Sequence, residues 1–282
     1  MKLFISADIE GCAGVALAYE THKNEAAYGE FAKQMTKEVV AGCEGAHEGG
    51  GLPFPCTPGE AADEAGADEI VVKDGHGDAT NIDPLCMPDY VTLIRGKSGH
   101  PYNMMSGLDD SFDGVMYIGY HAPAGNPGFA ISHTSTGNSL YIRLNGSCMS
   151  EFMLNSYTAA THKVPVLFLS GDSTICGLAR EMVPDITTAV TKTGLGASTY
   201  CKAPGQVEES IRQGVKKALA GNLSRCSVEL PETFTYEGTY KDWKKAYQMS
   251  FYPGMRAVDT FTNRLETARW MDVVTAHCFV VY

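Results

Sequence analysis

The stretch Phe4-Ile5-Ser6-Ala7-Asp8-Ile9-Glu10-Gly11 runs from an apolar segment directly into two carboxylates. A short apolar run of this kind is typical of a buried strand. Side chains two residues apart on a strand point to the same face, so Asp8 and Glu10 are expected to converge where the strand ends. Two carboxylates in dry surroundings need a proton, a cation or a metal to neutralise them. The stretch therefore predicts a core strand that ends in a charged site.

The composition limits the class of protein. A chain of 282 residues with 44% apolar content can bury a large core. The net charge of −11 argues against nucleic acid and anionic membrane as partners. Nine cysteines occur without a C-x-x-C pair, so we expect reduced thiols and no disulfide framework. With no apolar run long enough for a membrane helix or a secretion signal, we expect a soluble cytoplasmic protein.

Strands and helices alternate along the first two thirds of the chain. Apolar periodicity and turn signals predict a helix over 25–47, strands at 69–73, 115–118 and 164–169, a hairpin at 141–146 and a helix over 151–162. Such alternation predicts an α/β fold with a mainly parallel sheet and covering helices. We assign residues 1–190 to this metal-binding catalytic domain.

Two regions depart from that alternation. The Gly/Pro-rich segment 49–59 predicts a surface insertion or lid, with helical composition resuming at 60–65. Residues 191–282 predict a smaller mixed α+β region that packs on the first domain and takes part in assembly. It holds a predicted helix over 204–220 and β-like pieces at 227–230 and 233–236. The apolar stretch 270–281 fits no single element.

Three further metal-competent side chains follow predicted elements. His76 lies three residues past the strand at 69–73, His121 lies three residues past Ile118, and Glu151 opens a helix. Ligands of open α/β sheets bind at the carboxyl ends of the strands. With Asp8 and Glu10, the set offers three carboxylates and two imidazoles, which suit zinc or a similar divalent ion. If Asp8 bridged two ions, each ion would have three protein ligands, and two metals roughly 3.5–4 Å apart are a recurring hydrolytic device.

His133 lies in Ser132-His133-Thr134-Ser135, close in sequence to His121. A histidine beside a metal centre can act as general base, proton shuttle or nucleophile. Each candidate also has a plainer interpretation, since a strand-end aspartate can cap a loop and an acid in a first helical turn is favoured by the dipole. We expect structural or surface roles for the histidines that lack a glycine context after a strand, namely His22, His47, His100, His162 and His277.

Several short motifs match a known family in order and context. They are Ser6-Ala7-Asp8-Ile9-Glu10-Gly11, Asp74-Gly75-His76, Gly107-Leu108-Asp109-Asp110-Ser111-Phe112, Gly119-Tyr120-His121-Ala122, Ser132-His133, Glu151 with Leu154-Asn155-Ser156-Tyr157, and Val164-Pro165-Val166 with Ser170-Gly171-Asp172. The chain thereby resembles the zinc-dependent D-aminopeptidases encoded with bacterial dipeptide transporters. The resemblance spans most of residues 1–190 and is weaker beyond them.

This resemblance implies a site with two zinc ions per chain. Asp8 would bridge, Glu10 and His121 would complete one zinc site, and His76 and Glu151 the other. His133 matches the histidine proposed as nucleophile in the family, although general base or transition-state stabiliser is at least as plausible. The family forms homodecameric rings around a central chamber. The chain departs from the family in the segment 49–58, in Ser150, which replaces a glycine, and in its C-terminal third.

The resemblance implies an aminopeptidase that removes an N-terminal D-residue, such as D-Ala, from short peptides. One alternative keeps the dinuclear hydrolase but changes the substrate to L-peptides or another amide. The other is a non-catalytic oligomeric relative that retains metal for structural reasons. Metal stoichiometry discriminates between them, because a structural zinc is closed by four protein ligands and these sites would each have three.

Overall fold

The computed structural model describes residues 1–49 and 66–281. The segment expected to form an insertion at 49–59, apart from Gly49, and the helix expected at 60–65 lie outside the described residues. Among the described helices, none combines the length and apolar character that crossing a bilayer requires. The cysteines at described positions are free thiols.

A seven-stranded sheet forms the centre of the molecule, in the order β3-β2-β1-β4-β7-β8-β9. Its strands are β1 (Lys2–Ala7), β2 (Glu69–Asp74), β3 (Val91–Ile94), β4 (Gly114–Tyr120), β7 (Val166–Asp172), β8 (Thr187–Leu195) and β9 (Ser198–Cys201). All neighbouring pairs are parallel except β8 and β9. The predicted α/β class with a mainly parallel sheet is confirmed.

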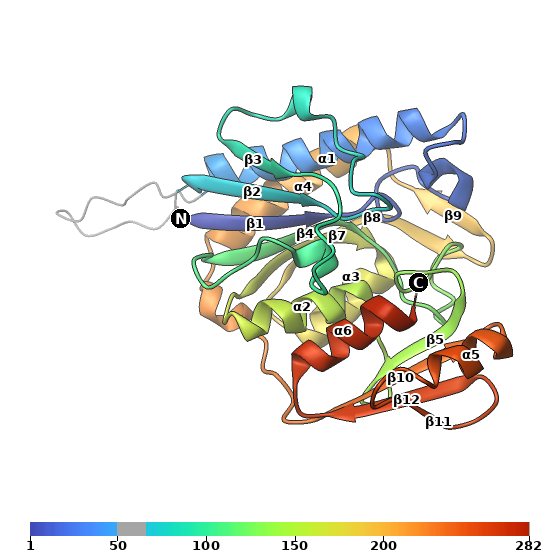
Figure 1. Ribbon diagram of the computed structural model, residues 1–282. Coiled ribbons are helices and arrows are strands. Elements are labelled where there is room, and N and C mark those ends of the chain that lie inside the picture. The colour runs from blue at the N-terminus through green and yellow to red at the C-terminus, as the bar shows by residue number, and fades with distance from the viewer. Residues whose placement is uncertain (50–65, 282) are drawn as a thin grey trace.

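Helices cover both faces of this sheet (Figure 1). On one side, α1 (Tyr28–Glu48) packs against α4 (Pro204–Leu219), and on the other α2 (Glu151–Thr161) lies beside α3 (Ser173–Met182). Strands β1, β4 and β7 are buried over almost their whole length. Buried parallel strands read as continuous apolar runs, which is why the sequence showed them.

A second, antiparallel sheet follows the order β11-β12-β10-β5-β6. It consists of β5 (Ser139–Leu144), β6 (Ser147–Cys148), β10 (Phe234–Tyr240), β11 (Arg256–Ala257) and β12 (Thr262–Thr267). The predicted hairpin joins β5 to β6, with positive φ at Asn145 and Gly146. Helix α5 (Trp243–Met249) contacts β10 and β12.

Residues 270–281 form mostly a helix, α6 (Trp270–Val280). It contacts α2 as well as β10 and β12, and so lies between a helix that covers the first sheet and the strands of the second sheet (Figure 1). Its exposed side carries the apolar residues Met271 and Phe279, so the helix has no polar stripe and its periodicity was uninformative. The strand expected at 227–230 was wrong: these residues form no strand and lead from a 3₁₀ turn, η4 (Leu223–Cys226), towards β10.

Sheet membership does not follow the expected division at residue 190. Strand β8 runs across that position, and β9 and α4 pack with the first sheet. Conversely, β5 and β6 come from before residue 190 and join the second sheet. The two layers are therefore interleaved in the chain.

Candidate metal centre and active site

The sheet order reverses between β1 and β4, and this is where the candidate ligands meet. The register pairs Ala7 with Asp74 on one side and with Ile118 on the other, so β1, β2 and β4 end at the same edge. Asp8 directly follows β1 and His121 directly follows β4. A crevice at such a switch point is the usual ligand site of open α/β sheets.

Glycines allow the two ligand-bearing strand ends to approach closely. The Gly11 N–H donates to the Gly119 carbonyl at 2.7 Å, and a Cβ at Gly11 would lie 1.9 Å from the Tyr120 carbonyl oxygen. Gly119 has φ +74°, and a Cβ there would lie 2.1 Å from the Asp8 carbonyl oxygen. Larger residues at either position would push Asp8 and His121 apart.

Other buried polar groups hold the ligand loops in place. Asp74 accepts hydrogen bonds from the Asn81 and Ile82 N–H groups, and the Asn81 amide donates to the His76 carbonyl at 2.7 Å. Asp172 accepts from the Ala122 N–H at 2.7 Å, next to His121. These buried carboxylates are thus loop anchors.

Ser150, the departure from the family pattern, has a local function. It is the N-cap of α2, and its hydroxyl accepts a hydrogen bond from the Met153 N–H at 3.0 Å. A serine here stabilises the first turn of the helix on which Glu151 stands.

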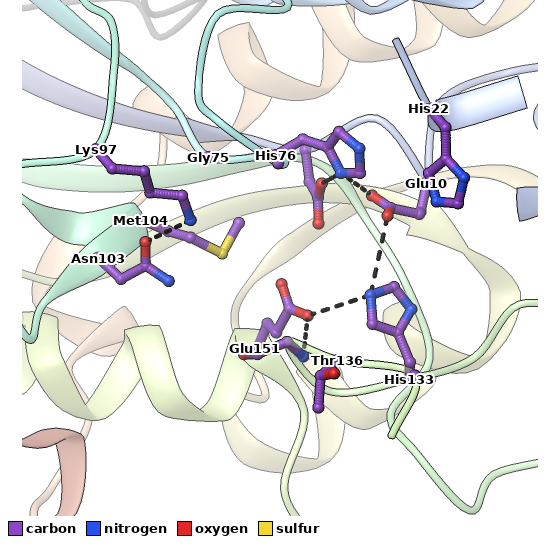
Figure 2. A pocket seen from close by; sticks show the side chains of 14 residues that line it. Glu10, His22, Gly75, His76, Lys97, Asn103, Met104, His133, Thr136 and Glu151 are labelled. Atoms are coloured by element: carbon purple, nitrogen blue, oxygen red, sulfur yellow. Dashed lines mark hydrogen bonds and ion pairs between the residues drawn. The ribbon is translucent and has the colours of Figure 1, made fainter. Parts of the chain in front are cut away.

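Five predicted ligands come together in two groups that share Asp8. Figure 2 shows three of these ligands, Glu10, His76 and Glu151. In the first group, His76 Nδ1 lies 3.3 Å from Asp8 Oδ1 and 2.9 Å from Glu10 Oε2. In the second, His121 Nε2 lies 3.6 Å from Asp8 Oδ2 and 3.5 Å from Glu151 Oε1. Within each group the candidate ligand atoms lie within 4.8 Å of one another.

The two groups that share Asp8 place His76 with Glu10 and His121 with Glu151, whereas the family resemblance implied Glu10 with His121 and His76 with Glu151. The reason is the sheet: the loop after β2 lies beside the loop after β1, while α2 begins on the β4 side. Asp8 belongs to both groups in either assignment, with one carboxylate oxygen facing each histidine. A third candidate group, of Glu10, His121 and His133, contains the implied pair of Glu10 with His121.

The histidines are oriented as metal ligands commonly are. The Nε2–H of His76 donates to the Thr21 carbonyl at 2.9 Å, and the Nδ1–H of His121 donates to the Ala122 carbonyl at 3.0 Å. A carbonyl only accepts, so the other ring nitrogen, which faces carboxylates, is the one left to bind a metal. His121 Nε2 and Glu10 Oε2 are buried without a hydrogen-bond partner. A cation in each of the two groups would satisfy these atoms, Glu10 Oε2 in the first and His121 Nε2 in the second, and the donor set of imidazole and carboxylate fits zinc.

The buried carboxylates of the site also favour a bound positive charge. Burial lowers the pKa of His121, but Glu151 and Asp8 outweigh burial and raise that pKa to about 10. Burial raises the pKa of Glu151, but the hydrogen bond and charge of His121 lower it to about 2. Burial and the charge of Glu10 together hold the pKa of Asp8 well above its usual range.

His133 lies between the two groups (Figure 2). Its Nδ1–H donates to the Ile131 carbonyl at 2.9 Å, which leaves Nε2 facing Glu10 Oε1 at 3.8 Å and Glu151 Oε1 at 3.9 Å. Its ring stacks on that of His121 with centroids 4.3 Å apart. It also forms a possible third ligand group with Glu10 and His121. The position suits either proton transfer at the centre or ligation.

A cavity of about 280 Å³ lies against the centre. Its lining includes Asp8, Glu10, His76, His133 and Glu151. Its wall includes residues for which sequence reasoning predicted no functional role: His22, Lys97, Asn103, Ser135 and Thr136. Figure 2 shows Lys97 and Asn103 on the opposite side of the cavity from Glu10 and His22. These side chains come from loops and the 3₁₀ turn η3 (Asn103–Met105), where no periodic pattern marks an inward-facing residue.

The sequence model of the D-aminopeptidase family, Peptidase M55, matches residues 1–278. The chain belongs to this family. The match runs through the C-terminal third, where the motifs were weakest. The predicted enzyme class, a hydrolase of the D-aminopeptidase type, is thereby confirmed.

A curated relative supports the family assignment, and a solved structure supports the fold. A D-aminopeptidase of Bacillus subtilis (strain 168) is 30% identical over 255 residues, which cover 90% of this chain and 86% of the relative. The solved structure of the Zn-dependent D-aminopeptidase DppA from Bacillus subtilis, described as a self-compartmentalizing protease, matches with a TM-score of 0.87. That likeness has 24% sequence identity, covers 99% of this chain and 96% of that one, and shows the fold.

Proposed function

We propose that this protein is an aminopeptidase that removes an N-terminal D-amino acid, such as D-Ala, from short peptides with two zinc ions. The observation that carries the proposal is the pair of ligand groups that share Asp8. In the first group Asp8, Glu10 and His76 would hold one ion, and in the second Asp8, His121 and Glu151 would hold the other. Three protein ligands per ion leave open positions, as catalytic zinc sites do.

The side chains around the centre have different roles in the proposed reaction. Zinc, when bound, supplies Lewis acidity towards the peptide carbonyl and activates water for attack. His133, which touches one carboxylate from each group, moves a proton or stabilises charge in the transition state. Asp8, Glu10 and Glu151 make this end of the cavity acidic, which suits the α-ammonium group of a peptide substrate.

The cavity also favours small substrates. Its volume of about 280 Å³ lies near the lower end of the range for small-molecule sites. Lys97 lies across from the acidic centre and donates to Asn103 Oδ1 at 2.8 Å. A dipeptide would place its ammonium group near the carboxylates and its own carboxylate towards Lys97, with the scissile bond between them.

The proposal includes a closed homo-oligomeric ring with the sites facing an inner chamber. The structural relative is described as self-compartmentalizing. Closed symmetric assemblies are the usual form of soluble homo-oligomers. The free thiols of the described cysteines fit a reducing compartment, and we propose the cytoplasm as the location.

Hydrolysis of a panel of D- and L-aminoacyl amides and dipeptides by zinc-replete protein tests the activity. We expect cleavage of the D-series, D-Ala first, and loss of cleavage on chelation. Preference for the L-series would retain the metallohydrolase but replace its substrate. Absence of all hydrolysis with both ions bound would favour the non-catalytic relative.

A further inference from the structure

Ser135 stands at the wall of the cavity in an unusual backbone conformation. Its φ is +60°, in the left-handed region that residues other than glycine rarely adopt. Its backbone N–H donates to Glu151 Oε1 at 2.7 Å, so the strained turn is tied to a proposed metal ligand. Strained residues of this kind concentrate at active sites.

Behind Ser135 lies a buried chain of two side chains from the C-terminal part of the molecule. His277 on α6 places Nε2 2.9 Å from Ser135 Oγ, and its Nδ1 lies 3.0 Å from the hydroxyl of Tyr236 on β10. His277 is 4% exposed and Tyr236 is fully buried. The three residues form a continuous hydrogen-bonded relay from the second sheet to the cavity.

The direction of each hydrogen bond in the relay follows from its members. Among the described residues, the Tyr236 hydroxyl has His277 Nδ1 as its hydrogen-bond partner, and burial holds the pKa of Tyr236 well above its usual range. The phenol hydrogen has no other acceptor among the described residues, and a buried hydroxyl hydrogen needs one, so the phenol donates to Nδ1. Burial lowers the pKa of His277 to about 4, and the neutral ring therefore carries its hydrogen on Nε2. That hydrogen is donated to Ser135 Oγ.

We propose that Ser135 is a substrate-binding residue, whose hydroxyl hydrogen is turned into the cavity by the Tyr236–His277 relay and donated to an oxygen of the substrate. Because Oγ already accepts a hydrogen bond from His277, its own hydrogen is left to point away from that ring, on the side where Ser135 lines the cavity. An oxygen that gains negative charge during hydrolysis is the natural acceptor, since a preorganised donor stabilises it most. This inference rests on the proposed peptidase function.

The expected acceptor is the carbonyl oxygen of the cleaved bond. Ser135 is bonded through its N–H to Glu151, beside the metal centre, whereas Lys97 lies across the cavity where a peptide carboxylate would bind. The relay also gives the C-terminal region a role in the site. The proposed metal ligands all come from the first 151 residues, whereas α6 and β10 carry the residues that orient the Ser135 hydroxyl.

The tautomer of His277 tests the relay without any measurement of activity. Solid-state ¹⁵N NMR of zinc-replete protein labelled at histidine, with His277 assigned by its absence in His277→Gln, should show a protonated Nε2 and an unprotonated Nδ1. Tyr236→Phe should weaken this preference, because the donor to Nδ1 is gone. A His277 with its hydrogen on Nδ1 would overturn the proposal, whatever the enzyme cleaves.

Kinetics test the role of the Ser135 hydroxyl. Ser135→Ala should lower kcat/KM by about 10-fold or more, as loss of a hydrogen bond to a charged group does, while zinc content stays unchanged because the bond to Glu151 comes from the backbone. His277→Leu should match this loss. His277→Gln keeps a donor and an acceptor and should retain most of the activity. Ser111→Ala, an exposed serine on the surface, is the matched control.

Substrate choice identifies the oxygen that is bound. An equal loss for a D-aminoacyl amide and the corresponding dipeptide assigns the hydroxyl to the carbonyl of the cleaved bond. A loss confined to the dipeptide assigns it to the substrate carboxylate. Full activity of Ser135→Ala on both overturns the role. Inactive wild-type protein would instead overturn the proposed peptidase function, and the NMR result would still report on the relay.

Discussion

Asp8 presents its two carboxylate oxygens to two different histidines, His76 and His121. Removal of this side chain would take a ligand from both proposed ions at once. We therefore expect Asp8→Ala to lose both metals and all measurable hydrolysis, and to be the most damaging of the ligand substitutions. Elemental analysis of zinc-reconstituted protein, paired with a hydrolysis assay, measures both effects.

Asp109→Ala is the matched control, because Asp109 is an exposed carboxylate whose side chain accepts hydrogen bonds from the nearby Ser111. It should keep wild-type metal content. Full metal and activity in Asp8→Ala would contradict the bridging assignment. Absence of transition metal from the reconstituted wild type would contradict the metal centre as a whole.

His133 touches carboxylates from both groups, and its ring is partly exposed to the cavity. If it moves protons or stabilises the transition state, His133→Ala should lower kcat by about 100-fold or more with both metals retained. Turnover and metal content, measured on the same preparation, decide the role. His100→Ala, an exposed histidine outside the centre, serves as control. Loss of metal together with activity would make His133 a ligand, as its third ligand group allows.

At the scale of secondary structure elements, β8 holds the loop that carries Glu10. The buried ammonium of Lys192 donates to the carbonyls of Glu10, Cys12 and Val15, and the Thr191 hydroxyl donates to the Gly11 carbonyl at 2.6 Å. Lys192→Met would leave three carbonyls without this donor and should cost roughly 3 kcal/mol or more of unfolding free energy.

Loosening of this loop should also weaken zinc binding at the Glu10–His76 group more than at the Glu151 group. Denaturant unfolding and zinc titration measure the two consequences. Lys202→Met, a lysine exposed just after β9, is the control. Unchanged stability and unchanged affinity for both ions would show that β8 does not position the loop.

Helix α1 contributes a second buried charge beside the same loop. Glu38 accepts the Ala13 N–H at 2.7 Å, and burial raises its pKa from 4.5 to about 7. Because the folded-state pKa is the higher one, its favourable contribution to stability is complete below about pH 4.5 and is lost as the pH rises to 7. Wild-type protein should lose on the order of 3 kcal/mol over this range relative to Glu38→Gln.

The comparison is made on metal-free protein, because zinc binding is itself dependent on pH. Denaturant unfolding of both proteins at a series of pH values gives the difference directly. Glu38→Gln keeps an acceptor for the Ala13 N–H, so the fold should be retained. Parallel stability curves for the two proteins would rule out the buried titration.

At the scale of the whole molecule, the region after β10 exposes several large apolar side chains. Trp243 is 52% exposed, Tyr247 66% and Phe251 70%, all on or next to α5, and Phe279 on α6 is 64% exposed. Such a concentration of apolar surface is typical of a contact with another protein. We expect these side chains to contribute to the contacts between subunits of the proposed ring.

We expect a large homo-oligomer, most simply a decamer of the 30.3 kDa chain, that cleaves dipeptides and tripeptides and spares folded proteins. Light scattering gives the mass, and a folded globular protein compared with the short peptides derived from it tests the restriction by size. Trp243→Glu with Phe251→Glu should dissociate the assembly if α5 lies in the interface. A monomer or dimer at micromolar concentration with activity intact would contradict the chamber and leave the metal centre unaffected.

The features that could be predicted from the sequence alone are local. Buried parallel strands are continuous apolar runs, so β1, β2, β4 and β7 were predicted, and Asp8, Glu10, His76 and His121 stood out because each follows such a run. Helix α6 was not predicted, since apolar residues such as Phe279 also occupy its exposed side and mask the amphipathic pattern. Strand β8 was missed as well, because its burial alternates irregularly.

Which of these residues come into contact depends on the packing of elements that are distant in the chain. The ligand groups follow from the register that sets Ala7 beside both Asp74 and Ile118, and the neighbouring strand ends, not the order of residues in the chain, pair His76 with Glu10. Ser135 and His277 are separated by 142 positions, and their hydrogen bond exists because α6 packs between the two sheets. A local pattern records the environment of one element, whereas a contact between distant elements depends on how all of them pack.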